Sequence, residues 1–520
     1  MMEMDKIVTE ADALAANAAT LGDHTALIFD AEKTSYRLLD MRASQIANGL
    51  RRLGLPYHGR VAILARNSAT YFELLFGIIR ADMTTLPLNW RLAAPEIIYI
   101  LQDAQVECLF YDEDFAEVVA QARAQCPTLR HCISIDGKGE DGLPAWRDRQ
   151  SSDRPVSQSE PEDIMIQFYT SGTTGHPKGV QISHRSSRVM REMEVAMGGE
   201  WLNWTHQDVA IVALPNFHLS GTSWALQWLA RGATCVIQPQ VDAGAFLKAI
   251  QDHGVTQIMA IPTVVQMMLD HPLFPSIDTS SLRNVFYGGM TMPAPRLRRA
   301  RAALGCNFIQ IYGMTENNGS TCYLTPADHA EGSEELLKSC GRPLPPIEMK
   351  IMNADGEEMA TGEIGEVCIK SPSLMSGYWN RDDIAQETHH GDFYRTGDAG
   401  YRDENGYLFL VDRTKDMIVS GGENVYPAEI ERVLVEHPGV VELSVIGVPD
   451  DRWGEAVKAV VVRGDDNLTG DELIAFARGK IAGYKVPKSV DFVDALPRNA
   501  NGKILKRELR DRYRNRADMS

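Results

Sequence analysis

The sequence predicts an α/β protein with a large N-terminal domain of layered sheets and helices, a small β-rich portion within it, and a smaller α+β domain at the C-terminal end. Two observations predict this class. Strand-like and helix-like segments alternate over the first two thirds of the chain, which is typical of largely parallel sheets covered by helices. The chain also has 520 residues, 44% of them hydrophobic, so it is long enough for more than one core.

Capping residues and apolar periodicity define the elements of the first section. Ser35 is expected to cap a helix that Gly54 is placed to end. Apolar residues recur on one face of this helix, at Leu38, Met41, Ile46 and Leu50. A buried strand is predicted at residues 61–64. Residues 137–162 are rich in Ser, Asp, Gly and Pro and are predicted to form a surface loop.

The middle section alternates in the same way. Strands are predicted at residues 233–237, 257–261, 284–287 and 308–312. One helix is expected to begin at Pro262, and another to cover residues 296–304 and end at Gly305. Because parallel sheets bind ligands at the loops beyond the carboxyl ends of their strands, we expect the functional loops there.

The pattern changes from Gly362 onwards. Short antiparallel strands with glycine turns are predicted at residues 366–369, at Tyr378 and at residues 407–411. A charged stretch follows, and we place the domain boundary there. The predicted division is an N-terminal domain at 1–411, a hinge at 412–416 and a C-terminal domain at 417–520. The last domain is expected to contain a helix from about Pro427 and a strand at 441–445.

Charge and composition exclude several classes of function. The chain has 52 Lys and Arg against 70 Asp and Glu, a net charge of −18, which disfavours a nucleic-acid partner but leaves room for a locally positive site. No secretory signal and no long apolar run are evident, so we expect neither export nor a transmembrane segment. Eight scattered cysteines without CxxC pairs indicate reduced thiols in a cytoplasmic protein, and no structural zinc site.

The strongest local signal is the stretch of residues 169–179, which follows an apolar segment. Glycines allow backbone N–H groups to turn towards an anion, hydroxyls add donors, and a lysine adds charge. This chemistry suits the β and γ phosphates of a nucleoside triphosphate, although the spacing is not that of a Walker A loop. A flexible surface loop is the alternative. The candidate phosphate-binding residues are Thr170, Ser171, Gly172, Thr173, Thr174, Gly175 and Lys178.

Further motifs follow in order along the chain. They are Phe217-His218, Tyr287-Gly288-Gly289, Tyr312-Gly313-Met314-Thr315-Glu316, Tyr394-Arg395-Thr396-Gly397-Asp398, Asp412-Arg413-Thr414-Lys415, Ser420-Gly421-Gly422, and a terminal stretch from Leu496 to Lys503. An aromatic ring can stack on a base, glycine permits close backbone approach, and a carboxylate suits either Mg²⁺ or a pair of ribose hydroxyls. Read singly, each motif is also compatible with an ordinary turn or a solvated charge.

Together, from about residue 165 to 505, these motifs resemble the adenylate-forming superfamily of acyl-CoA synthetases, luciferases and peptide-synthetase adenylation domains. The resemblance implies that Tyr312 packs on adenine, Thr315 contacts the α-phosphate and Glu316 holds Mg²⁺. It likewise implies a ribose contact from Asp398, a ribose or phosphate contact from Arg413, and a catalytic Lys503. Lys415 would be the hinge of a mobile C-terminal domain, and Gly421 and Gly422 would contact pantetheine. The expected catalytic residues are Lys503, Glu316, Thr315 and Lys178, and the expected substrate pocket is His218, Trp224, Gly288, Gly289, Met290, Gly313 and Asn317.

The implied activity is that of an ATP-dependent, AMP-forming acyl-CoA ligase that uses ATP, Mg²⁺ and coenzyme A. A carboxylic acid with an uncharged tail is favoured, because no Asp stands where an amino-acid-activating domain places its amine partner. A medium- or long-chain fatty acid is the first expectation and an aryl or alicyclic acid the second. Alternatives are an adenylation enzyme loading a separate carrier protein, a luciferase-like oxygenase and a non-catalytic nucleotide-binding protein. A homodimer is expected only by analogy with the family.

Overall fold

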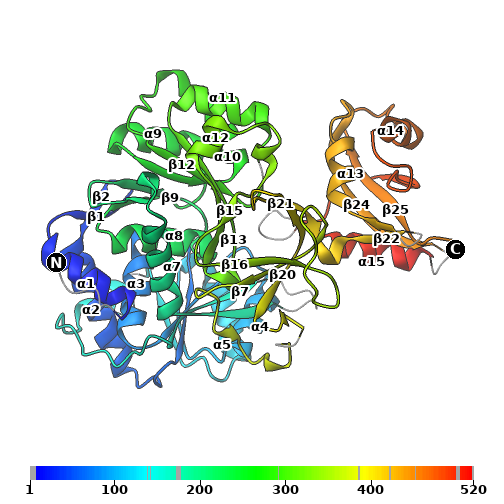
Figure 1. Cartoon of the computed structure of the whole chain (residues 1–520). Helices are drawn as coiled ribbons and strands as arrows, with labels where there is room; N and C mark the ends of the chain where they lie inside the picture. The colour runs from blue at the N-terminus through cyan, green and yellow to red at the C-terminus, as the bar shows by residue number, and fades with distance from the viewer. Residues whose placement is uncertain are drawn as a thin grey trace. The chain divides into compact units, whose positions relative to one another are not determined.

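The computed structural model describes residues 8–137, 139–140, 142–170, 177–290, 292–384, 387–420, 423–450, 452–478, 480–498 and 504–517. The chain forms two compact units. The larger consists of Met1–Glu348 with Lys370–Glu387, and the smaller of Met349–Ile369 with Thr388–Ser520. Figure 1 colours the chain from blue at the N-terminus to red at the C-terminus.

The larger unit contains a nine-stranded sheet with the order β15-β14-β13-β12-β11-β9-β10-β1-β2. Its central strands, from β13 to β1, run parallel, and antiparallel strands complete both ends. The strands are β1 (Thr25–Phe29), β2 (Glu32–Ser35), β9 (Val209–Val212), β10 (Thr234–Ile237), β11 (Gln257–Ala260), β12 (Asn284–Gly288), β13 (Asn307–Met314), β14 (Gly319–Leu324) and β15 (Arg342–Pro343).

A second, seven-stranded sheet in the same unit has the order β18-β8-β7-β4-β3-β5-β6. Strands β7, β4, β3, β5 and β6 are parallel, and β8 and β18 extend the sheet antiparallel. The strands are β3 (Arg60–Leu64), β4 (Thr84–Pro87), β5 (Cys108–Tyr111), β6 (His131–Ser134), β7 (Ile164–Thr170), β8 (Lys178–Ser183) and β18 (Gly377–Tyr378).

Helices accompany both sheets, and side-chain caps begin several of them. The Ser35 hydroxyl accepts a hydrogen bond from the Leu38 N–H at the start of α2, and Gly305 ends α11 with φ of 63°. Figure 1 shows α9 to α12 gathered around β12. The helices are α1 (Glu10–Thr20), α2 (Tyr36–Arg52), α3 (Ala69–Arg80), α4 (Ala94–Asp103), α5 (Ala116–Gln125), α6 (Leu143–Asp148), α7 (His184–Met197), α8 (Leu219–Ala230), α9 (Ala243–His253), α10 (Pro262–Asp270), α11 (Ala294–Leu304) and α12 (Pro326–Glu331).

The smaller unit contains two five-stranded sheets. One has the order β16-β17-β20-β19, with β21 paired to β20, and the other β23-β22-β25-β24, with β26 paired to β25. Apolar residues of α13, α14, β24 and β25 form a core between helices and sheet. The elements are β16 (Glu348–Met352), β17 (Gly365–Lys370), β19 (His389–His390), β20 (Phe393–Arg402), β21 (Leu408–Arg413), β22 (Ile418–Ser420), β23 (Glu423–Val425), α13 (Pro427–Leu434), β24 (Val440–Asp450), β25 (Gly454–Arg463), α14 (Gly470–Ala477), β26 (Ser489–Phe492) and α15 (Lys506–Ala517).

The predicted α/β class and largely parallel sheets are confirmed. The prediction of a surface loop over residues 137–162 was wrong in one part, because α6 forms within it. The Trp146 ring of this helix packs 5.7 Å from the Phe110 ring, so tertiary burial decides a segment whose composition indicates a loop. The predicted division at residues 412–416 stays a prediction. Among the described residues, no helix has the length and apolar character needed to span a bilayer.

Candidate active site

The predicted phosphate loop joins two antiparallel strands. Thr170 at the end of β7 is the register partner of Lys178 at the start of β8, so the two strands pair directly at this point. Five predicted site residues of this loop, Ser171, Gly172, Thr173, Thr174 and Gly175, lie outside the described residues. The strand pairing therefore brings Thr170 and Lys178 together at one end of the seven-stranded sheet.

Lys178, Tyr378 and Glu316 converge beside this hairpin. Lys178 Nζ lies 5.2 Å from the centroid of the Tyr378 ring, and the Tyr378 hydroxyl donates a hydrogen bond of 3.1 Å to Glu316 Oε1. Strand β18 places Tyr378 opposite Val180 of β8. The Met375 N–H also donates to the Glu316 carbonyl, at 2.7 Å. These contacts place a carboxylate and an ammonium group against the same tyrosine side chain.

The charges around Lys178 are mixed. Partial burial lowers the pKa of Lys178 below its usual value, and Arg381 lowers it further. Three carboxylates act in the opposite direction: Glu387, Glu316 and Asp383. A bound polyanion would favour the protonated form of this lysine. The pKa of the Lys178 ammonium thus depends on burial and on the neighbouring charges.

The turn after β13 carries Thr315 and Glu316 in a short 3-10 helix, η5 (Thr315–Asn317). A Cβ on Gly313 would lie 2.0 Å from the Gly319 carbonyl oxygen, so only glycine fits there. The Asn317 amide donates to the Ser320 carbonyl and the Thr321 hydroxyl at 3.2 and 3.1 Å. Ser373 Oγ donates to Asn317 Oδ1 at 3.0 Å.

These bonds engage both ends of the buried Asn317 amide, so the side chain holds the turn that presents Glu316. Its predicted place in the substrate pocket stays a prediction.

The carboxyl ends of β11, β12 and β13 form a partly apolar edge. Gly288 and Gly289 end β12, and Gly289 has φ of 80°. Met290 and Ile261, which lie just beyond β12 and β11, remain 59% and 41% exposed. Tyr312 on β13 is buried. Such an edge offers an apolar surface and close backbone approach to a flat ligand.

The predicted substrate-pocket residue His218 is the N-cap of α8. Its ring lies 4.8 Å from the Phe217 ring, and Phe217 in turn contacts Trp90 at 6.3 Å. Trp224 lies within α8 and is 9% exposed. The two predicted pocket residues thus belong to one helix, with His218 at its beginning.

In the smaller unit, the ribose candidates Asp398 and Arg413 are register partners on β20 and β21. Arg413 Nε lies 2.9 Å from Asp398 Oδ1. The Asp398 N–H donates to the Thr396 hydroxyl at 3.1 Å, and Asp398 is buried. A carboxylate oriented in this way can accept hydrogen bonds from two neighbouring hydroxyls.

The predicted hinge follows directly. The Asp412 carboxylate accepts hydrogen bonds of 2.7 Å from the N–H groups of Arg413 and Ala428, so it binds the first turn of α13. Lys415 is exposed in η8 (Thr414–Asp416). Partial desolvation lowers the pKa of Lys415, although Asp416 raises it. The predicted pantetheine residues Gly421 and Gly422 and the predicted catalytic Lys503 lie outside the described residues.

The donor set suits a magnesium nucleotide. Glu316 supplies a carboxylate, the ligand that Mg²⁺ prefers. Gly313, Gly288 and Gly289 leave room for close backbone approach. A cation would be held by Glu316 and would neutralise phosphate charge. This arrangement can stabilise negative charge that develops at a transferred phosphoryl group.

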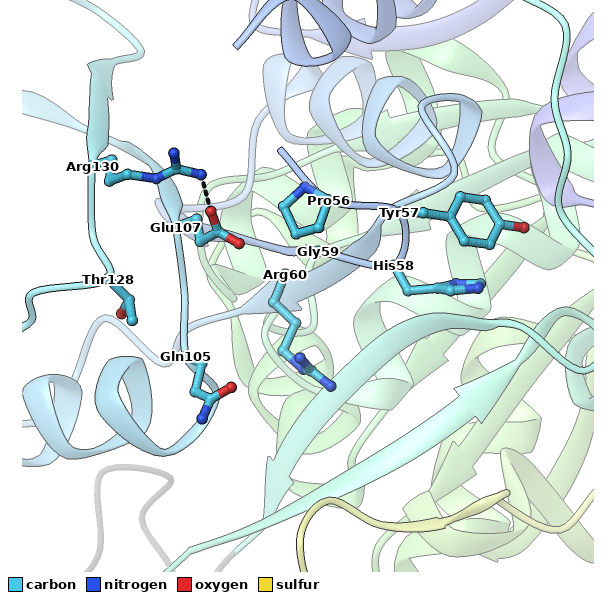
Figure 2. A pocket seen from close by; sticks show the side chains of 9 residues that line it. All are labelled: Pro56, Tyr57, His58, Gly59, Arg60, Gln105, Glu107, Thr128 and Arg130. Atoms are coloured by element: carbon cyan, nitrogen blue, oxygen red, sulfur yellow. Dashed lines mark hydrogen bonds and ion pairs between the residues drawn. The ribbon is translucent and has the colours of Figure 1, made fainter. Parts of the chain in front are cut away.

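A separate surface cavity of about 420 Å³ contains none of the predicted site residues. Figure 2 shows Glu107 and Arg130 paired on one side of it, with Arg60 extending away from them. Arg60 Nε donates to Gln167 Oε1 at 3.0 Å, and Gln167 Nε2 donates to the Tyr169 hydroxyl at 3.2 Å. Arg60 also lies 3.3 Å from the centroid of the Trp379 ring. Arg60 of the cavity wall therefore contacts Gln167 of β7 and Trp379, which follows β18.

Sequence reasoning missed Tyr378 as a site residue. It was predicted only as part of a strand, and its local sequence carries no signal of its role. The contact with Glu316 spans 62 positions of the chain, so only the pairing of β18 with β8 reveals it.

The chain is similar in sequence to a known protein family. The chain matches the AMP-binding enzyme family over residues 14–379 and the C-terminal domain of that family over residues 429–503. The chain belongs to the AMP-binding enzyme family. The resemblance to the adenylate-forming superfamily is thereby confirmed.

Relatives within the AMP-binding enzyme family differ in the acid and the acceptor that they are named for. The fatty acid–[acyl-carrier-protein] ligase ScoC of Streptomyces coeruleorubidus is 39% identical, with 94% of this chain and 93% of that protein covered. A feruloyl-CoA synthase of an Amycolatopsis species is 38% identical, with 92% and 94% covered.

A solved structure of the o-succinylbenzoate CoA synthetase MenE of Bacillus subtilis, in complex with the acyl-adenylate OSB-AMP, is also similar. It has a TM-score of 0.85 and 29% identity, and the match covers 96% of this chain and 98% of that chain. The same enzyme has been solved with ATP and a magnesium ion. Magnesium nucleotide and acyl-adenylate are thus bound on this fold.

Proposed function

We propose that this protein is an ATP-dependent, AMP-forming acyl-CoA ligase that converts a carboxylic acid first to an acyl-adenylate and then to a coenzyme A thioester. The observation that carries the proposal is the convergence of Glu316, Tyr378 and Lys178 beside the β7–β8 hairpin. Membership of the AMP-binding enzyme family supports the same chemistry.

In the first half-reaction, a carboxylate oxygen of the acid attacks the α-phosphorus of ATP. The bond from the α-phosphorus to the bridging oxygen breaks, and pyrophosphate leaves. Bound Mg²⁺ supplies charge neutralisation between the phosphates. Lys178 and the hydroxyl of Thr170 contact the β and γ phosphates, Thr315 contacts the α-phosphate, and Lys503 stabilises the charge that develops there. No protein nucleophile is needed, because positioning and electrostatics supply the catalysis.

In the second half-reaction, the thiol of coenzyme A attacks the acyl carbonyl carbon. The carbon–oxygen bond to AMP breaks, AMP carries away the electron pair, and a thioester forms. We assign Asp398 and Arg413 to the nucleotide and Gly421 and Gly422 to pantetheine. Lys415 is the residue whose backbone torsions change between the two half-reactions, since a change at an exposed charged linker leaves the side chain solvated.

The acid lies against the apolar edge formed by Gly288, Gly289 and Met290, with His218 and Gly313 near its carboxyl group. A second candidate function is acyl transfer to a carrier protein instead of coenzyme A. This second candidate is supported by the 39% identity to a ligase that is named for an acyl carrier protein. Both functions share the adenylation step and differ only in the thiol that accepts the acyl group.

The decisive experiment is AMP release from ATP and Mg²⁺ with a panel of acids, with and without coenzyme A. Release that depends on both an acid and coenzyme A, with formation of the thioester, would support the ligase. Acid-dependent pyrophosphate exchange without a thioester would assign the acyl group to a carrier protein. The absence of both pyrophosphate exchange and AMP release with every acid tested would overturn the proposal.

We also propose a cytoplasmic location and a homodimer. None of the eight cysteines, all of which lie among the described residues, is in a disulfide, which suits a reducing compartment. Light scattering coupled to size-exclusion chromatography would measure the oligomeric state, and a mass of one chain would contradict the dimer.

A further inference from the structure

Five side chains form a closed network beside the paired ends of β7 and β8. The Tyr169 hydroxyl donates a hydrogen bond to Asp103 Oδ2 and accepts one of 3.2 Å from Gln167 Nε2. Arg60 Nε donates to Gln167 Oε1 at 3.0 Å. The Arg60 guanidinium lies 3.3 Å from the centroid of the Trp379 ring, and Trp379 Nε1 donates to the Asp103 carbonyl at 2.8 Å. We refer to these five residues as the Tyr169 network.

The Tyr169 network joins four separate segments of the larger unit. Arg60 begins β3, Asp103 ends α4, and Trp379 follows β18. Gln167 and Tyr169 are two positions apart on β7, so their side chains lie on the same face of the strand. Gln167 is fully buried, and its amide is engaged at both the oxygen and the nitrogen. These contacts fix the side chains that surround the Tyr169 hydroxyl.

The Tyr169 network touches both strands next to the predicted phosphate-binding residues. Tyr169 immediately precedes Thr170, and its register partner Gly179 immediately follows Lys178. The Trp379 N–H donates to the Gly179 carbonyl at 2.8 Å. A Cβ at Gly179 would lie 2.6 Å from an amide nitrogen of the network, so glycine is needed there. The network therefore fixes the backbone beside Thr170 on one strand and beside Lys178 on the other.

Asp103 occupies a position that helix formation does not favour. It is the last residue of α4, and a carboxylate at this end of a helix meets the negative end of the helix dipole. The last turn of α4, all of it described, has no basic residue. The compensation comes from other segments, because Tyr169 donates to the carboxylate. Burial lowers the pKa of Arg60, whereas Tyr169 and Asp103 raise it, so Asp103 also favours the charged form of this arginine.

The bond between Tyr169 and Asp103 is a persistent one. Burial raises the pKa of Tyr169 well above its usual value, and the hydrogen bond to Asp103 raises it further. The hydroxyl thus stays protonated and remains a donor. Hydrogen bonds to a carboxylate are shorter and stronger than those between neutral groups. The residue that precedes Thr170 is therefore anchored to the end of α4.

We propose that Asp103 is a positioning residue for the phosphate-binding residues: by anchoring Tyr169 it sets where Thr170 and Lys178 lie, and so favours nucleotides with β and γ phosphates over AMP. This inference rests on the proposed function and adds to it a residue that acts through another. The acyl-adenylate carries no β or γ phosphate. The Tyr169 network is therefore needed for the first half-reaction and not for the second.

The first test separates the two half-reactions. Tyr169→Phe removes the hydroxyl and keeps the ring. The kcat/KM for ATP in acid-dependent pyrophosphate exchange should fall by about tenfold or more, because a small misplacement of binding groups is costly. Thioester formation from synthetic acyl-adenylate and coenzyme A should stay within about twofold of wild type. General destabilisation would reduce both half-reactions, so an equal loss in both would overturn the inference.

The second test addresses the Asp103 carboxylate. Asp103→Asn keeps an acceptor for the Tyr169 hydroxyl and Asp103→Ala does not, so the loss of pyrophosphate exchange should be smaller in Asp103→Asn. The double variant Tyr169→Phe/Asp103→Ala should lie within about twofold of the more impaired single variant, because both changes remove the same bond. Losses that multiply in the double variant would contradict the coupling.

The matched control for both tests is Tyr57→Phe. The Tyr57 hydroxyl also donates to an aspartate carboxylate, that of Asp163 at 2.9 Å, and neither residue belongs to the Tyr169 network. Tyr57→Phe should keep the wild-type rates of both half-reactions. A loss of pyrophosphate exchange in Tyr57→Phe as large as that in Tyr169→Phe would contradict a specific role for Asp103.

A binding measurement makes the result independent of turnover. The non-hydrolysable analogue α,β-methylene-ATP and AMP can each be titrated by calorimetry with Mg²⁺ present. The wild type should bind the analogue more tightly, and this preference should fall by about tenfold in Tyr169→Phe and Asp103→Ala. Tyr169→Phe decides the outcome if Asp103→Ala does not fold.

The binding outcomes distinguish this inference from the proposed function. A preference for the analogue that persists in the variants would overturn the inference and leave the ligase function intact. A preference that is lost in the variants would support the inference even if no acid gave AMP release. A wild type that binds AMP as tightly as the analogue would overturn the inference.

Discussion

The Tyr378 hydroxyl donates a hydrogen bond of 3.1 Å to Glu316 Oε1, while the ring of the same tyrosine lies 5.2 Å from Lys178 Nζ. One side chain therefore touches the proposed magnesium ligand and the proposed phosphate-binding cation. A carboxylate that is oriented by a neighbouring donor presents its second oxygen in a defined direction. Tyr378 is thus a positioning residue for Glu316.

Replacing Tyr378 by Phe should raise the Mg²⁺ concentration needed for half-maximal adenylation. The variant keeps the ring beside Lys178 but loses one hydrogen bond to a charged group, which corresponds to about 1.5–3 kcal/mol, a factor of roughly 10 to 150. Acid-dependent pyrophosphate exchange as a function of Mg²⁺ concentration would measure this change. Tyr57→Phe is a matched control, because the Tyr57 hydroxyl also donates a hydrogen bond to a carboxylate, that of Asp163 at 2.9 Å, and Tyr57 has no proposed role in adenylation. An unchanged Mg²⁺ dependence in Tyr378→Phe would refute the positioning role.

Replacing Asp398 by Asn should reduce the preference for ATP over 2′-deoxy-ATP. If the carboxylate accepts a hydrogen bond from the 2′ hydroxyl of ribose, replacing the carboxylate should reduce this preference by about tenfold or more. The KM of each nucleotide in the acid-dependent reaction would show the change. Arg395→Gln is the control, because it breaks the neighbouring 2.7 Å ion pair with Glu366 and leaves Asp398 intact. A preference that persists in Asp398→Asn would exclude Asp398 from ribose binding.

Replacing Lys503 by Ala should lower acid-dependent pyrophosphate exchange by about a hundredfold or more, because a cation at the developing charge is removed. Thioester formation from synthetic acyl-adenylate and coenzyme A should persist. The control is Lys506→Ala, whose ammonium is paired with Glu431 at 2.8 Å and has no proposed role in adenylation. Equal loss of both half-reactions in Lys503→Ala would contradict the assignment.

Acid should destabilise the protein through His184. Burial lowers the pKa of His184 to about 4, whereas an unfolded histidine titrates near 6.5. Because the unfolded chain binds this proton first, stability that is present above pH 6.5 is lost as the pH falls towards 4, by about 3 kcal/mol. In His184→Gln the drop in the thermal unfolding midpoint between pH 7 and pH 5 should be smaller than in wild type. The exposed His206→Gln serves as control, and identical drops in all three proteins would contradict this account.

Local patterns were sufficient to predict much of the fold. The Ser35 cap, the helix from Pro262 and the end of α11 at Gly305 are confirmed, because capping and glycine conformations depend on a few adjacent residues. Helix α6 was missed, since its composition is that of a loop and contacts with distant residues stabilise it: Trp146 packs on Phe110, and Arg147 pairs with buried Glu73 at 2.8 Å.

The sequence by itself determined the family, the chemistry and the order of the motifs, because each motif is a short run whose residue types carry its function. Only the tertiary structure decided which of those residues meet. It brought Tyr378 to Glu316 through the pairing of β18 with β8, Asp398 to Arg413 through the register of β20 and β21, and Trp224 to Phe286 across α8 and β12. Contacts between segments far apart in the chain depend on strand order and packing, and no local pattern encodes them.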